Sequence, residues 1–133
     1  MYAFDFDRGF ELLDVSWNGL FCPREVSRYA ASLRQAFAEA QFTPGYLLRI
    51  DMRGAGVQSQ AGLRAFRREF AGFPAASRIA VVTESTLTQM QVGREMRQPY
   101  LEVTGSADAA MDWLIGGRRA VQPALSSLPR LST

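Results

Sequence analysis

Strand patterns alternate with helix patterns along this sequence, and this alternation constrains the fold more than any other feature. Two strand-like segments come first, at residues 2–7 and 10–17, and three more follow at 46–52, 79–82 and 100–104, each after a helical stretch. A chain that alternates in this way forms right-handed crossovers and a largely parallel sheet. The sequence therefore predicts an α/β fold with a mixed, mostly parallel five-stranded sheet, in the element order β-β-α-β-α-β-α-β-α.

The first two strand segments are joined by a short connection. Tyr2, Phe4 and Phe6 alternate with small or acidic residues, which is typical of a strand with one buried face. The dipeptide Arg8-Gly9 interrupts this pattern before the second segment begins. So short a connection favours an antiparallel hairpin at one edge of the sheet.

Each helix is predicted from apolar residues that recur three and four positions apart. The longest spans about Pro23 to Gln41, and proline fits its first turn because a missing N–H costs nothing there. Ser85 and Ser106 are expected to cap the two later helices. Large apolar side chains mark the buried face of the second helix: Leu63, Phe66, Phe70 and Phe73.

The chain has 133 residues, which is the length of one domain. Residues 1–117 are predicted to form this single domain. Residues 118–133 contain two prolines and lack periodicity, so we expect a flexible C-terminal tail there. No apolar run approaches the roughly 20 residues that span a bilayer, and the chain is therefore predicted to be cytoplasmic and not transmembrane.

The residue types present exclude several kinds of chemistry. All fifteen basic residues are arginine, so the chain contains neither lysine nor histidine, and Cys22 is its one cysteine. A P-loop and a Schiff base each need a lysine, and Ser-His-Asp or Cys-His triads need an imidazole. One cysteine without histidine does not build a four-ligand zinc site. We therefore expect no metal, no cofactor and no catalytic residue of these types.

The net charge of +2 depends on the end of the sequence. Arg118, Arg119 and Arg130 all lie in the last sixteen residues, and the rest of the chain has twelve arginines against thirteen carboxylates. A nucleic-acid-binding domain of this size carries a basic patch or stripe. The charge distribution therefore predicts that nucleic acid is not the partner.

Two loops follow parallel strands and are predicted to meet at the edge of the sheet where α/β proteins usually bind ligands. One loop spans residues 51–60 and the other spans 83–86. Both lead into a helix N-terminus, where free backbone N–H groups favour an anion. The candidate binding residues are Asp51, Arg53, Gly54, Gly56, Ser59, Thr83, Glu84 and Ser85, together with Arg64 and Arg67 on the second helix.

Structural interpretations compete with binding at most of these positions. Gly54 and Gly56 could simply let the chain turn after a strand, and Ser59 could serve as a helix cap. Asp51 could form an acid–base pair with Glu84, or it could order the amides of its own loop. The arginines could form a solvated helix face. The abundant phenylalanines could fill the core or leave an apolar groove beside it.

Three segments together resemble a known fold family. They are the stretch Ser59-Gln60-Ala61-Gly62-Leu63, the strand Arg78-Ile79-Ala80-Val81-Val82 and the helix Ala110-Met111-Asp112-Trp113-Leu114. Over residues 1 to 116 this layout resembles the SpoIIAA-like branch of the STAS superfamily, which some classifications group with SEC14-type lipid-binding domains. In the anti-sigma-factor antagonists of that superfamily, a partner kinase phosphorylates a serine at the start of the second helix and so switches partner binding. The resemblance implies phosphorylation of Ser59, although Gln58 stands where that motif has aspartate.

Three functional hypotheses follow. The first is a non-enzymatic regulatory or binding module whose working surface comprises Arg53 to Arg68 and Thr83 to Ser85. The second is a carrier of a small lipophilic ligand in a groove between helices and sheet, and the third is an enzyme that uses Asp51 and Glu84. The expected partner is a protein or a small lipophilic or anionic ligand. We also expect a homodimer, paired through the edge of the N-terminal hairpin, whose outer face is predicted to carry Leu13, Val15 and Trp17.

Overall fold

The computed structural model describes residues 1–95 and 100–116. The predicted domain end at 117 and the predicted tail at 118–133 lie outside these residues. The element order within them agrees with the predicted order. The elements are β1 (Tyr2–Asp7), β2 (Leu12–Trp17), α1 (Pro23–Ala40), β3 (Leu47–Asp51), α2 (Gln60–Phe70), β4 (Arg78–Val82), α3 (Thr86–Glu95) and β5 (Leu101–Thr104), followed by a helix over residues 107–116.

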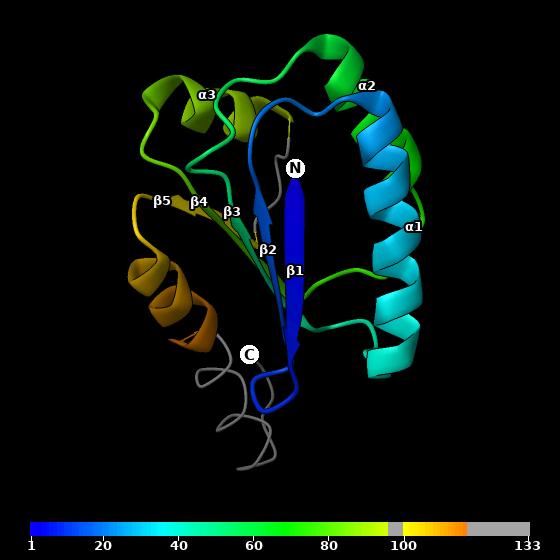
Figure 1. Cartoon of the computed structure of the whole chain (residues 1–133). Coiled ribbons are helices and arrows are strands. Elements are labelled where there is room, and N and C mark those ends of the chain that lie inside the picture. Colours follow the sequence, from blue (N-terminus) through cyan, green and yellow to red (C-terminus); the bar gives the residue numbers. More distant parts are fainter. Residues whose placement is uncertain (96–99, 117–133) are drawn as a thin grey trace.

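The five strands form one sheet in the order β1-β2-β3-β4-β5. β1 pairs with β2 in the antiparallel sense, and every later neighbouring pair is parallel. This topology confirms the predicted α/β class and the predicted hairpin. The parallel strands therefore all end at the same edge of the sheet, and α3 lies beyond that edge (Figure 1).

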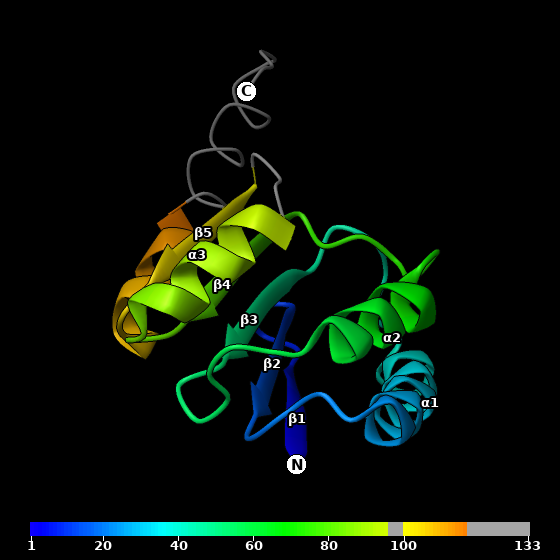
Figure 2. The same ribbon diagram turned by 90° about the horizontal axis from the view of Figure 1, so that it is seen from above.

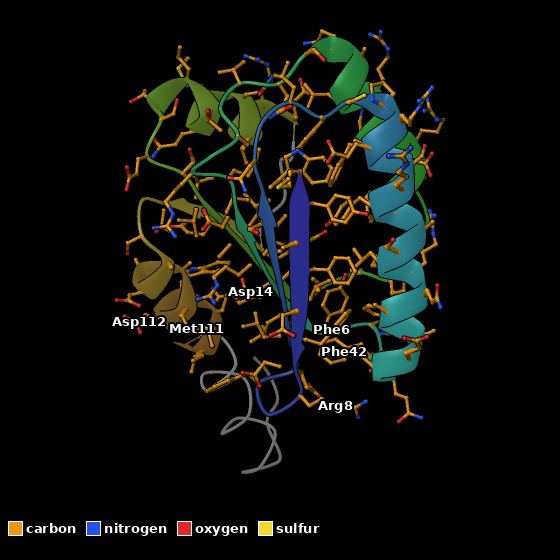
Figure 3. The ribbon with its side chains drawn as sticks, viewed as in Figure 1. Phe6, Arg8, Asp14, Phe42, Met111 and Asp112 are labelled. Carbon is orange, nitrogen blue, oxygen red and sulfur yellow. The ribbon has the colours of Figure 1, made fainter. Side chains whose placement is uncertain are left out.

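Helices cover both faces of the sheet. α1 and α2 pack on one face, and the helix over 107–116 packs on the other (Figures 1 and 2). Phe6 and Phe42 lie between the sheet and α1, with ring centroids 4.9 Å apart, whereas Asp14 points to the opposite face (Figure 3). None of the helices in the described ranges is long and apolar enough to cross a bilayer.

The face of β2 that was predicted to be the outer face of the hairpin is buried. Leu13, Val15 and Trp17 are each at most 3% exposed and belong to the main core, which also contains Tyr29 of α1. The reason is that α1 folds back over this face of the hairpin (Figure 1). The expectation that these three side chains form an exposed dimer face is therefore wrong.

The helix ends follow the expected capping chemistry. Gln41 adopts a left-handed conformation, with φ of 60°, and ends α1. The Ser59 hydroxyl accepts a hydrogen bond from the Gly62 N–H at 3.1 Å. Ser85 and Ser106 accept equivalent bonds at the starts of α3 and the 107–116 helix, at 3.2 and 3.0 Å. All three serines are N-caps, as the sequence predicts.

A smaller core lies on the opposite face of the sheet. Leu47, Ala80 and Val82 meet Leu114 of the 107–116 helix there, and all four are buried. At the margin of this core, the guanidinium of Arg78 stacks 3.7 Å from the ring centre of Trp113. This second layer explains why β4 has a nearly continuous apolar sequence, because both of its faces are covered.

Candidate functional site

The carboxyl edge of the parallel strands is organised by two buried glutamines. The Gln58 carboxamide accepts from the Phe21 N–H at 2.5 Å and donates to the Gly19 carbonyl at 3.1 Å. The Gln91 carboxamide of α3 in turn accepts from the Gln58 N–H at 2.8 Å and donates to the Gln58 carbonyl at 2.9 Å. Four hydrogen bonds thus hold the loop before α2, the loop before α1 and α3 together. Sequence reasoning did not select either residue, because the bonded groups lie 33 or more positions apart.

The two loop glycines have structural roles at this edge. A Cβ at Gly54 would lie 1.9 Å from the Asn18 side-chain oxygen, so a side chain there would require the Asn18 side chain to move. Gly56 has φ of 72°, a conformation that favours glycine. Both residues therefore shape the loop, which agrees with the simpler of the two sequence interpretations.

Asp51 is held by its neighbour Arg53. The Arg53 guanidinium donates to both carboxylate oxygens, at 3.0 and 2.8 Å, and the Arg53 backbone N–H donates at 3.0 Å. These hydrogen bonds lower the pKa of Asp51 below its usual value. A carboxylate stabilised in its ionised form is a poor proton carrier near neutral pH. Because Glu84 is also exposed, the arrangement does not favour an acid–base pair of these two residues.

Of the three predicted binding residues between β4 and α3, only two are exposed. Thr83 is 1% exposed, and its backbone N–H donates to the Thr104 carbonyl, so it extends the sheet. Its hydroxyl accepts from the Ser85 N–H at 3.3 Å. Thr83 therefore differs from expectation, since its side chain does not reach the surface. Glu84 and Ser85 are exposed at this edge.

The two arginines of α2 that the sequence predicts to bind differ in their contacts. Arg67 reaches α3 and forms an ion pair with Glu95 at 2.5 Å. Arg64 is exposed and makes no ion pair within the described residues. Ser59, at the start of the same helix, is also exposed. Of the residues predicted in α2 and at its N-cap, Arg64 is thus an exposed cation without an ion pair among the described residues, and Ser59 is an exposed serine.

Four large apolar side chains are exposed around the glutamine network. In sequence, Leu20 lies between Gly19 and Phe21, which both bond the Gln58 side chain, and Val57 directly precedes Gln58. Leu87 and Met90 lie on one face of α3, next to Gln91. Their exposed fractions range from 46% to 66%. Sequence analysis missed this set because the apolar character of a residue does not reveal its exposure.

A cavity of about 70 Å³ lies beneath this edge, between the sheet and the helices α1, α2 and α3. Trp17, Phe21, Tyr29 and Phe66 provide most of its aromatic wall. Every phenylalanine except the exposed Phe10 packs in or against the main core, as the simpler sequence interpretation expects. The cavity is the part of the structure that matches the predicted apolar groove.

Neither a known family model nor a curated protein matches the chain in sequence. Solved structures do match it. An uncharacterised protein with a SpoIIAA-like fold from Shewanella loihica PV-4 aligns with a TM-score of 0.67 and 17% identity, over 85% of this chain and 93% of that one. An anti-sigma factor antagonist from Mycobacterium paratuberculosis aligns with a TM-score of 0.57 and 13% identity, over 86% and 95% of the two chains.

SpoIIAA, an anti-sigma factor antagonist solved in its unphosphorylated form, gives a TM-score of 0.57 and 13% identity, over 87% of this chain and 99% of its own. All three neighbours thus align over almost their whole length. These alignments show a shared fold, but at identities this low a shared fold does not transfer a function. The chain has the SpoIIAA-like fold that its sequence motifs predict.

Proposed function

We propose that this chain is a non-enzymatic regulatory module that binds a protein partner through the surface around the start of α2. We call this the α2 surface and define it by Arg53, Ser59 and Arg64 and the exposed apolar residues Leu20, Val57, Leu87 and Met90. The observation that carries the proposal is that these four exposed apolar side chains all lie in segments that the hydrogen bonds of Gln58 and Gln91 join at the carboxyl edge of the sheet. Grouped apolar side chains with a charged surround are typical of protein-binding surfaces.

The fold neighbours support the same kind of function. Two of them are anti-sigma factor antagonists, a name that describes action on another protein. A shared fold alone does not transfer this role. Together with the exposed apolar residues, however, it favours a protein partner over a substrate.

Site-specific photocrosslinking in the host organism tests the placement. A photoreactive amino acid at Val57 or at Leu87 is expected to capture the same partner protein. The matched control is Phe10, which is 44% exposed and lies in the β1–β2 turn at the opposite end of the sheet. Equal capture of that partner from position 10, or capture of no common partner from positions 57 and 87, would contradict the proposal.

Phosphorylation of Ser59 is the regulatory step we propose for this surface. Ser59 is exposed at the start of α2, where a phosphate would meet free backbone N–H groups and add negative charge to the partner surface. The neighbour SpoIIAA was solved in its unphosphorylated form, a description that implies a phosphorylated form of that protein. Denaturing mass spectrometry of the chain from its own host tests the step by searching for phosphate on Ser59.

The second candidate function is a carrier of a small lipophilic molecule. The observation that favours it is the cavity of about 70 Å³ with its aromatic wall. Organic extraction of the freshly purified chain, followed by mass spectrometry, tests this function. A bound molecule at near-stoichiometric amount supports it, and an extract with none counts against it.

A homodimer through the free edge of β1 stays a prediction. β1 is an edge strand, so the outward side of its backbone faces no neighbouring strand. The Asp5 carboxylate accepts from the Phe6 N–H at 3.0 Å, and like charges would meet if two such strands paired. Sedimentation at high concentration decides between a dimer and a monomer, and Asp5→Asn is expected to favour the dimer.

A further inference from the structure

The cavity beneath the carboxyl edge of the sheet reaches the surface between α2 and α3. Its deeper wall comes from β2 and α1 and includes Val15, Trp17 and Tyr29, each at most 4% exposed. Arg67 of α2 is the one exposed residue of the lining, and its ion-pair partner, Glu95 of α3, is partly exposed. Among the described residues no Cα atom of α2 lies within 8 Å of one of α3, and the two helices stand apart in Figure 2. The cavity therefore opens at the ion pair.

The interior of the cavity suits a small apolar group. Aliphatic and aromatic side chains make up most of its lining, and the carboxamides of Gln58 and Gln91 are already bonded within the glutamine network. An apolar cavity of about 150 Å³ holds a molecule of benzene. This cavity, at about 70 Å³, has room for a smaller group, of the size of a valine or leucine side chain. Such a side chain gains free energy there because it leaves water.

The mouth of the cavity carries more positive than negative charge. Glu95 accepts from Arg67 at 2.5 Å, and the Arg94 Nε lies 3.7 Å from its other carboxylate oxygen. Arg64 lies one turn before Arg67 and makes no ion pair within the described part of the chain. The other carboxylate of these two helices, Glu69, contacts α1 instead. Three guanidinium groups thus stand near one carboxylate, and charge complementarity favours an acidic partner.

We propose that the partner of the α2 surface inserts one aliphatic side chain into this cavity and presents carboxylates to Arg64 and Arg94 at its mouth. This inference rests on the first of the two functions proposed above, and it describes the partner segment as acidic with an aliphatic anchor. Leu87, Met90 and Arg94 are spaced three and four residues apart, so they lie along one side of α3. One continuous segment can therefore meet the cavity, the exposed apolar side chains and the arginines together.

Peptide selection tests the chemistry of the partner. A library of random short peptides displayed on phage serves as the probe, and the selected peptides are then synthesised and titrated onto the wild-type chain. We expect them to combine valine, leucine or isoleucine with aspartate or glutamate. Their affinity should fall roughly tenfold in Arg94→Glu and roughly fivefold when the salt concentration rises about tenfold. Arg28→Glu, which changes an exposed arginine of α1, should leave the affinity unchanged.

Methyl NMR spectra of the wild-type chain report on the anchor. Met52 and Val92 line the cavity and are at most 6% exposed, so their methyl signals should shift when a selected peptide binds. Val82 is buried in the smaller core on the opposite face of the sheet, and its methyl signals should not move. Val92→Phe fills the cavity and should lower the affinity for the peptides roughly tenfold. If that variant does not fold, the wild-type methyl signals decide the question.

The outcomes separate this inference from the function beneath it. Selected peptides without carboxylates, peptides that leave the Met52 and Val92 signals unchanged, or a selection that yields no peptide would each overturn the inference. A small molecule that co-purifies with the wild-type chain and shifts the same signals would also overturn it, since the cavity would then belong to the carrier function. The crosslinks from Val57 and Leu87 test the protein-binding function independently, so its failure is distinguishable from the failure of this inference.

Discussion

Replacement of Gly62 by alanine is expected to destabilise the protein, although the same change stabilises most helices. Alanine in place of a helical glycine usually gains about 1 kcal/mol. At Gly62, however, a Cβ would lie 2.3 Å from the backbone oxygen of Phe21 and 2.8 Å from its Cβ. The Phe21 segment has little freedom to move, because its N–H is bonded to Gln58. The substitution therefore overpacks the contact between α2 and the loop before α1.

The net effect is a loss of about 2 kcal/mol in the free energy of unfolding, since overpacking and a disturbed buried hydrogen bond cost more than the helix gains. Gly93 provides the matched control, because it is exposed in α3 and a Cβ there meets nothing within 4 Å. Gly93→Ala should gain roughly 0.5–1 kcal/mol. Urea denaturation followed by tryptophan fluorescence measures both. If Gly62→Ala stabilises the protein as much as Gly93→Ala does, the close approach of Phe21 to α2 is wrong.

Three further changes test the carboxyl edge of the sheet. Gln91→Leu leaves the N–H and carbonyl of Gln58 unpaired, which costs roughly 1–3 kcal/mol for each group. Amide hydrogen exchange at residues 58–59 should therefore accelerate. Unchanged protection of these amides would refute the role of the glutamine network. Ser59→Ala removes the cap of α2 and should lower stability by about 1 kcal/mol in thermal melts, whereas Ser59→Asp should retain it. Asp51 has a lowered pKa because Arg53 bonds its carboxylate, so its contribution to stability is present above the ordinary pKa of aspartate and is lost as the pH falls through the lowered value in the folded state. Asp51→Asn should remove that part of the acid dependence in denaturant melts at several pH values, and an unaltered pH profile would contradict the Asp51–Arg53 contact.

The elements of this fold were predictable because local chemistry determines them. Alternation at residues 2–7 indicates the edge strand, and the serines at 59, 85 and 106 cap their helices through bonds to residues three positions away. The covered face of the hairpin was predicted incorrectly for Trp17 and its neighbours. Alternation shows which side chains share a face, but the path of α1 decides which face is buried, and that path is a tertiary property.

The candidate site was predictable only in part, for a similar reason. The topology of parallel strands correctly brings the loops at 51–60 and 83–86 to one edge. Thr83, however, lies one residue too early to reach the surface, because it continues the sheet beside Thr104. The pairing of Gln58 with Gln91, the cavity and the exposure of the apolar residues depend on contacts between distant segments. No local sequence pattern encodes these features.

Native mass spectrometry of the chain isolated from its own host tests the central claim, that the α2 surface binds a protein partner. We predict that the wild-type chain carries a second protein, that Arg64→Glu loses it and that the same charge reversal on α1, Arg28→Glu, retains it. Arg64 and Arg28 are both exposed helical arginines, so the comparison isolates the position of the charge. A wild-type chain free of any other protein, or equal amounts of partner on the wild type and Arg64→Glu, would contradict the account.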